Sequence, residues 1–134
     1  TSDVAGSITA VRFYKGPQNT GTHVADLWSS SGQLLATATF SNETPSGWQQ
    51  VSFATPVPIQ ANTTYIVSYH TNTGFYSATS AYFNGFSANS WPLHAPDSAT
   101  AGGNGVFAYG ADPTFPSSSF NGTNYWVDVV FTSP

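Results

Sequence analysis

The sequence predicts an all-β protein: an antiparallel β-sandwich, jelly-roll or immunoglobulin-like, with about eight strands. Short runs rich in β-branched and aromatic residues alternate apolar and polar side chains along the 134 residues. Turn-forming glycine, proline and asparagine separate these runs at short, regular spacing. Because no long stretch repeats its apolar residues at helical spacing, helices are not expected.

The expected strands, in chain order, are SITAVRFY, HVADLW, QLLATATF, WQQVSFA, TYIVSYH, FYSATSAYF, GVFAYG and NYWVDVVF. Side chains two residues apart in a strand share a face of the sheet. In the last run the core face is expected to hold Tyr125, Val127, Val129 and Phe131, opposite Trp126 and Asp128. In the run TYIVSYH the residues Tyr65, Val67 and Tyr69 share a face, opposite Ile66, Ser68 and His70.

A single long loop is expected near residues 84–104, lying across one end or face of the sandwich. Pro92 and Pro96 stiffen it, and the sequence GGNG lets the backbone turn back into the next strand. Leu93 is the expected buried anchor of this loop, with Trp91 at least partly exposed. Three other asparagines begin Asn-x-Ser/Thr triplets and are interpreted as turn residues: Asn42, Asn62 and Asn121.

The length fits one domain over residues 1–134. Charged residues are only 6% of the chain, and the formal net charge is −4. The two basic residues, Arg12 and Lys15, provide no footprint for nucleic acid and no membrane anchor.

Lys15, before Gly16 and Pro17, is expected to be a solvated turn residue. The absence of cysteine excludes a disulfide, a thiol nucleophile and a cysteine-ligated zinc.

Catalysis is not expected, since the acidic residues fall mostly in turn sequences and no G-x-S-x-G motif is present. A carboxylate pair or a serine triad is still compatible with the residue counts.

The histidines His23, His70 and His94 lack close metal-ligand spacing, so hydrogen-bonded structural roles are expected. No cofactor is expected. Calcium is considered only at Asp97, where the run PDSATAGGNG offers side-chain and backbone oxygens without a complete calcium-loop motif.

The aromatic residues point to a ligand. Trp28 and Trp48 adjoin strands and are expected to pack on the core. The aromatics of the loop region are too many to be buried together, and exposed aromatic rings can stack on the C–H faces of sugars while polar side chains bind the hydroxyls. A carbohydrate-binding set is therefore predicted in the 75–110 region: Tyr76, Trp91, His94, Asn104 and Tyr109.

Several motifs, in order along nearly the whole chain, resemble one bacterial extracellular family catalogued as a domain of unknown function. They are VRFYKG, SGWQQVSF, YIVSYH, GGNGV and NYWVDVVF. The resemblance implies a β-sandwich module appended to secreted glycoside hydrolases and other surface proteins. It therefore implies an extracellular or cell-surface location.

Two functions are consistent with this picture. The first is a non-catalytic module that binds neutral polysaccharide. The second is a structural subunit or repeat of a surface filament, sheath or adhesin stalk, whose partners are other copies of itself. The resemblance also implies one more strand before Thr1. We therefore expect an open sheet edge beside the NYWVDVVF or SITAVRFY strand, or an edge filled by another chain or by the C-terminal segment.

Overall fold

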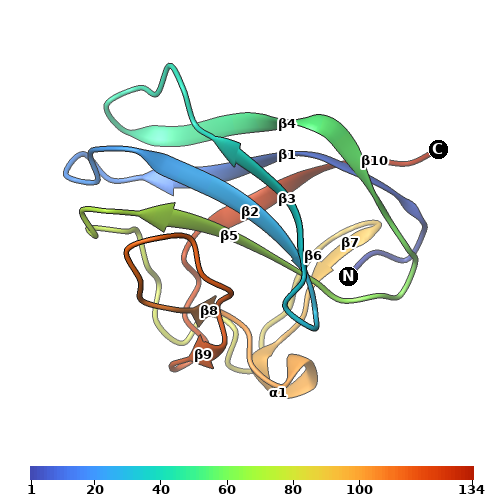
Figure 1. Ribbon diagram of the computed structural model, residues 1–134. Helices are drawn as coiled ribbons and strands as arrows, with labels where there is room; N and C mark the ends of the chain where they lie inside the picture. The colour runs from blue at the N-terminus through green and yellow to red at the C-terminus, as the bar shows by residue number, and fades with distance from the viewer.

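Two three-stranded antiparallel sheets pack face to face in the computed structural model, which describes residues 1–134 (Figure 1). One sheet has the order β10-β1-β4, formed by β1 (Gly6–Lys15), β4 (Gly47–Ile59) and β10 (Val127–Thr132). The other has the order β3-β2-β5, formed by β2 (His23–Ser29), β3 (Leu34–Thr39) and β5 (Tyr65–Thr71). The predicted β-sandwich is confirmed.

The alternation of apolar residues produces the core between these sheets. Ile8, Val11 and Phe13 of β1 face Ala25 and Leu27 of β2. The predicted inner faces of β5 and β10 are also confirmed, with Tyr65, Val67, Tyr69, Val127, Val129 and Phe131 packed against this cluster. Tyr125 departs from the prediction, because it precedes β10 and packs against other aromatic rings.

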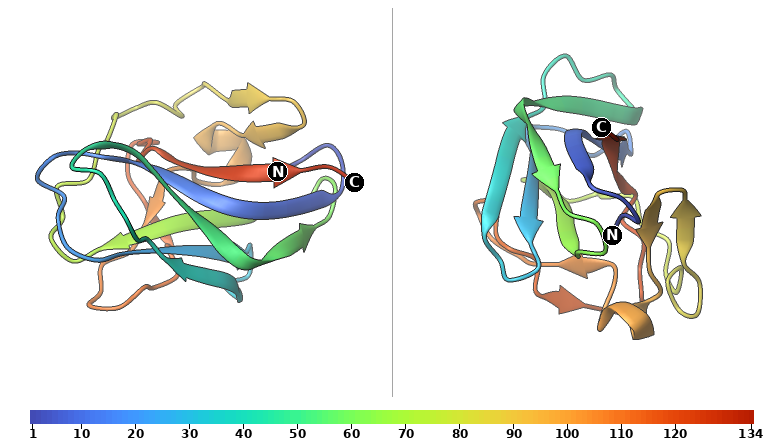
Figure 2. Two further views of the ribbon diagram at one scale, coloured as in Figure 1. Left: turned by 90° about the horizontal axis from the view of Figure 1, so that it is seen from above. Right: turned by 90° about the vertical axis from the view of Figure 1, so that its right-hand side faces the viewer.

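Short elements fill the second half of the chain. The segment expected as a long loop contains a hairpin, β6 (Ala88–Ser90) and β7 (Leu93–Ala95), and a one-turn helix, α1 (Ser98–Ala101). A second small pair is formed by β8 (Val106–Phe107) and β9 (Ser118–Ser119). Figure 2 shows that these pieces form a layer beside and below the two main sheets. The chain has no helix long and apolar enough to cross a membrane.

The anchor of this layer is Phe83 instead of Leu93. Phe83 is buried, whereas Leu93 is only half-buried and pairs with Ser2 in an isolated β-bridge. Trp91 is 78% exposed at the turn of the β6–β7 hairpin, as expected.

The expected strand over residues 75–83 does not form. Phe75 and Ala81 have φ values of 53° and 60°, which interrupt an extended strand. A bridge between Thr79 and Asn124 is the only strand-like pairing of this segment. Its backbone hydrogen bonds, such as those of Ala81 and Phe83, go to the turn at 121–122.

The three triplet asparagines Asn42, Asn62 and Asn121 have φ values of 54–55°, which confirms that they are turn residues.

The two sides of the sandwich, where the edge strands of the two sheets meet, are not equally closed. β3 lies near β4 on one side, and β5 lies near β10 on the other. β1 is paired on both edges, so the expectation of an open edge is wrong for the SITAVRFY strand. β10 pairs only with β1, and β5 pairs only with β2. The far edges of β5 and β10 therefore keep backbone groups without a strand partner, as expected for the NYWVDVVF strand.

A buried polar cluster closes one end of the sandwich. Lys15 is only 7% exposed, so its expected solvation is wrong. Its Nζ lies 3.2 Å from Glu43 Oε1, and the Nδ1 atom of His23 lies 2.9 Å from the same oxygen. The other nitrogen of His23 lies 2.8 Å from Asn19 Oδ1, which also accepts a hydrogen bond from the Thr71 hydroxyl. This cluster joins the β1–β2 connection to the end of β5.

The two tryptophans expected in the core differ. Trp28 is buried, although it packs on the outer face of its sheet against Phe115, and its indole N–H donates to Ser68. Trp48 is 40% exposed and lies beside Tyr14, with the Arg12 guanidinium 4.8 Å from the centre of its ring. The expectation that Trp48 packs on the core is wrong, because Trp48 occupies an outward-facing position of β4.

Glu43→Gln is expected to lower the free energy of unfolding by about 3 kcal/mol, because the change leaves the Lys15 ammonium buried without a counter-charge. Urea denaturation measures the loss. Asp112→Asn is the matched control, since it removes one negative charge from an exposed turn, and it is expected to change stability by less than about 0.5 kcal/mol. Equal losses in the two variants would contradict the structural role of the cluster.

Gly105→Ala and Gly102→Ala form a second matched pair, because both glycines have a φ of 71°. A Cβ at Gly105 would overlap the carbonyl oxygen of Thr123, whereas a Cβ at Gly102 would have open space around it. We expect Gly102→Ala to lower the free energy of unfolding by about 1 kcal/mol through its backbone conformation alone. Gly105→Ala should cost about 3 kcal/mol, because overpacking is added. Thermal unfolding of both variants tests this, and similar losses would be inconsistent with the close approach.

Candidate functional site

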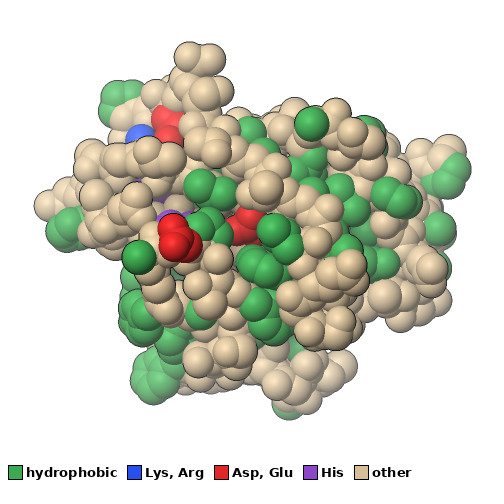
Figure 3. Space-filling model, in the orientation of Figure 1, with side chains coloured by type: hydrophobic (Ala, Val, Ile, Leu, Met, Phe, Trp, Pro, Cys, Tyr) green, Lys and Arg blue, Asp and Glu red, His purple; other side chains and the backbone are tan.

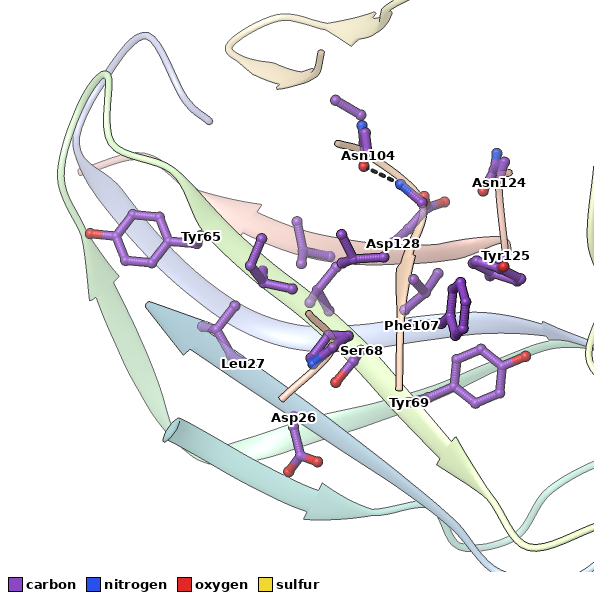
Figure 4. A pocket seen from close by; sticks show the side chains of 18 of the residues that line it. Asp26, Leu27, Tyr65, Ser68, Tyr69, Asn104, Phe107, Asn124, Tyr125 and Asp128 are labelled. Carbon is purple, nitrogen blue, oxygen red and sulfur yellow. Dashed lines mark hydrogen bonds between the residues drawn. The ribbon is translucent and has the colours of Figure 1, made fainter. Parts of the chain in front are cut away.

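A cavity of about 880 Å³ lies along the open side of the sandwich, where the edges of β5 and β10 approach each other. Its lining comes from both faces of β5 and of β10, from the β6–β7 hairpin and from residues 101–116. Figure 4 shows that the walls combine core side chains such as Leu27 with aromatic and amide side chains. The backbone groups on the far edges of β5 and β10 have no strand partner, so they are available along this cavity.

Four aromatic rings from three separate segments meet at one end of the cavity. Tyr76 lies edge-on to Tyr125 with ring centres 5.4 Å apart, and Phe107 lies 6.3 Å from Tyr125 and 5.6 Å from Tyr109. Tyr109 is 82% exposed and Tyr76 is 45% exposed. We call Tyr76, Phe107, Tyr109 and Tyr125 the aromatic rim.

The hydroxyls of Tyr76 and Tyr125 have raised pKa values and remain protonated at neutral pH. Burial raises the pKa of Tyr76, and the neighbouring Tyr109 adds to the shift. Burial also raises the pKa of Tyr125, with a further contribution from Tyr76. Each of these rings therefore presents an apolar face together with a neutral hydroxyl that can donate or accept a hydrogen bond.

The local backbone explains how the rim is assembled. The Thr79–Asn124 bridge brings the chain after β5 next to the chain before β10, which places Tyr76 near Tyr125. Gly105 allows the backbone to pass against Thr123, so that Phe107 and Tyr109 reach the same place. Rings from three segments that are well separated in the sequence are thus brought together by backbone contacts.

Four of the five predicted binding residues line the cavity: Tyr76, His94, Asn104 and Tyr109. Only Tyr76 and Tyr109 belong to the rim. Trp91 does not belong to the lining, since it lies at the tip of the β6–β7 hairpin. Its role in ligand binding stays a prediction.

Two of the lining residues have structural hydrogen bonds. The Asn104 side-chain amide donates to the carbonyl of Pro96 at 2.6 Å, and its oxygen accepts from the Gly105 N–H at 2.7 Å. His94 bonds to Asn89 at 2.7 Å through Nδ1 and lies 2.9 Å from Asp3 through Nε2. These contacts shape the loop layer and occupy both ring nitrogens of His94, whereas the Asn104 amide keeps one N–H and part of the acceptor capacity of its oxygen.

Asp97, considered for calcium, is the N-cap of α1. One of its carboxylate oxygens accepts hydrogen bonds from the N–H groups of Ala99 and Thr100, and the other accepts from the Thr100 hydroxyl. These hydrogen bonds, above all that from Thr100, lower the pKa of Asp97. Helix capping accounts for the position of this residue. No group of three or more His, Cys, Asp or Glu side chains in the chain is placed to hold a metal ion.

Two carboxyl groups of the lining have raised pKa values. Burial raises the pKa of Asp26, against the opposing effects of Thr37 and His70. Burial also raises the pKa of Asp128, opposed by the Arg12 guanidinium. Asp26 lies on the outward side of β2, and Asp128 on the outward side of β10, in different sheets. They face away from each other, so they do not form the closely spaced pair that glycoside hydrolysis uses.

Sequence reasoning missed Tyr69, Phe107 and Tyr125. The first was assigned to the core, and the last was expected on a core-facing strand position. Phe107 stood in a run expected to be a strand, and β8 is only two residues long. The period-two pattern is the only signal that could have found them, and it does not distinguish a core face from a cavity wall.

The surface is poor in charge. Figure 3 shows few charged side chains among the polar and apolar ones on the face that it presents. Of the two basic residues, Lys15 is buried and Arg12 is half-buried against Trp48. An anionic polymer would find no cluster of positive charge here.

No curated protein and no solved structure matches the chain. One family model matches residues 1–127, and its description is "Domain of unknown function (DUF4082)". Since that match covers nearly the whole sequence, up to the first residue of β10, the chain belongs to the DUF4082 family of domains of unknown function.

Proposed function

We propose that this domain is a non-catalytic module that binds neutral polysaccharide in the cavity between β5 and β10. The observation that carries the proposal is the aromatic rim, in which the exposed rings of Tyr76 and Tyr109 stand at a cavity of about 880 Å³. Its setting would be extracellular or on a bacterial cell surface, as a module of a larger secreted protein.

The chemistry of the lining supports a sugar ligand. A pyranose ring has apolar C–H faces and a polar perimeter, so it needs both flat apolar surfaces and uncharged hydrogen-bonding groups. The rim provides the first, and the tyrosine hydroxyls and unpaired strand edges provide the second. The scarcity of basic side chains favours an uncharged polymer over an acidic one.

Retention on insoluble cellulose, chitin, xylan, mannan and β-glucan tests the proposal, with affinity electrophoresis for the soluble forms. We expect retention on at least one of them. If none retains the domain, the proposal is wrong.

Tyr109→Ala and Tyr76→Ala are expected to weaken binding to the retained glycan by about 1–2 kcal/mol each, because each removes a stacking surface. Phe120→Ala is the matched control: Phe120 is 70% exposed and lies outside the cavity lining, so its removal should leave the affinity unchanged. Thermal unfolding should be nearly the same for Tyr109→Ala and Phe120→Ala. Trp91→Ala belongs in the same series, and a loss of affinity there would extend the site to the β6–β7 hairpin.

The second candidate function is that of a structural subunit of a surface assembly that associates through strand edges. One observation favours it: β10 and β5 each have an edge without a strand partner. Exposed edges of this kind are templates for strand addition from another chain.

If this second function holds, the domain should form concentration-dependent oligomers in size-exclusion chromatography with light scattering. Val129→Pro should reduce this association, because proline removes a backbone donor from β10. Pro58, already in β4, shows that the fold accepts proline in an edge strand. A monomer at every concentration, with no filaments in electron micrographs, would contradict this function.

A further inference from the structure

The ring of Tyr69 is fixed on the wall of the cavity. It stacks on Phe13 with ring centres 4.3 Å apart and an angle of 18° between the planes. Tyr69 belongs to the inward side of β5 and is part of the cavity lining. Figure 4 draws it on the same side of the pocket as Phe107 and Tyr125.

The hydroxyl of Tyr69 is buried and has no hydrogen-bond partner in the protein. Tyr65, on the same face of β5, differs in this respect, since its hydroxyl accepts a hydrogen bond from the Gln60 N–H at 3.1 Å. An unpaired buried hydroxyl lowers stability and is uncommon in native proteins. Such a group at the wall of a cavity is free to bind a ligand.

Tyr76 stands next to this hydroxyl. Burial raises the pKa of Tyr69 above its usual range, and Tyr76 adds to the rise, so the hydroxyl remains a donor. The Tyr76 ring itself is 45% exposed and follows Gly74 and Phe75, both in the left-handed backbone region. Because the hydroxyl is buried in the free protein, a ligand reaches it only when a covering side chain moves, and the partly exposed Tyr76 is the candidate.

We infer that Tyr69 is a specificity-determining residue: its hydroxyl binds a free hydroxyl of a sugar unit that passes beneath the Tyr76 ring into the cavity. The inference rests on the proposed glycan-binding function. It adds that the ligand enters the cavity and is not only stacked on the rim. The substrate class is a neutral glycan whose bound unit carries an unsubstituted hydroxyl at the end that enters.

The test is isothermal titration calorimetry with cellohexaose, chitohexaose, xylohexaose and mannohexaose. Tyr69→Phe keeps the ring on Phe13 and removes only the hydroxyl. For the hexasaccharide that binds, we expect about five- to tenfold weaker affinity, the effect of one lost hydrogen bond. Tyr14→Phe is the control, because Tyr14 is half exposed outside the cavity lining, and it should bind as the unsubstituted protein does.

Thermal unfolding without sugar gives an independent readout. Tyr69→Phe should have the same unfolding midpoint as the parent or a higher one, because no hydrogen bond within the protein is lost. Tyr65→Phe should have a midpoint lower by roughly 3 °C, because it leaves the Gln60 N–H without its partner. If Tyr69→Phe lowers the midpoint as Tyr65→Phe does, the hydroxyl is already paired in the free protein and the inference is overturned.

The two proposals fail in different ways. If Tyr76→Ala and Tyr109→Ala weaken binding and Tyr69→Phe does not, the inference is overturned and the glycan-binding function stands. If no hexasaccharide and no polysaccharide binds any form of the domain, both are overturned. If Tyr69→Phe binds the hexasaccharide more weakly and its unfolding midpoint is unchanged, both the inference and the glycan-binding function are supported.

Discussion

The contact between Phe13 and Tyr69 joins the two sheets, and the rest of the structure depends on it. Phe13 comes from the centre of one sheet and Tyr69 from the edge of the other. Phe40 and His23 pack on the same phenylalanine ring, with centres 4.9 Å away in both cases. The apolar core therefore ends directly at the buried polar cluster of Lys15, Glu43 and His23. Tyr69, which stacks on Phe13, also forms part of the cavity wall.

The strands of the two main sheets could be predicted because their side chains alternate between two environments. Tyr65, Val67 and Tyr69 were assigned correctly to an inner face because their apolar spacing is regular. The segment 75–83 is also rich in aromatic residues but does not form a strand, since its backbone turns at Phe75 and Ala81 and bonds to residues 121–124. Such contacts between distant segments are not visible in a local pattern.

The candidate site could be predicted only in part, for the same physical reason. Tyr76 and Tyr109 were found because the aromatics of the 75–110 region are too many to be buried together, although both stand in runs that were expected to form strands. Phe107 and Tyr125 join them through the passage of Gly105 against Thr123, a contact that depends on the folded chain. Lys15 was misassigned because a lysine before Gly-Pro is ordinarily solvated. Its partner Glu43 lies across the sandwich end, and sequence spacing gives no sign of the pairing.

The burial of Lys15 also affects how the molecule meets its partners. With one of two cations inside and the other stacked on Trp48, the surface creates little positive potential. If the ligand is the proposed neutral glycan, its encounters with the domain are governed by free diffusion without long-range steering, and their rates should vary little with ionic strength. Under that proposal, binding would depend on short-range contacts alone, so its affinity should be nearly independent of salt concentration.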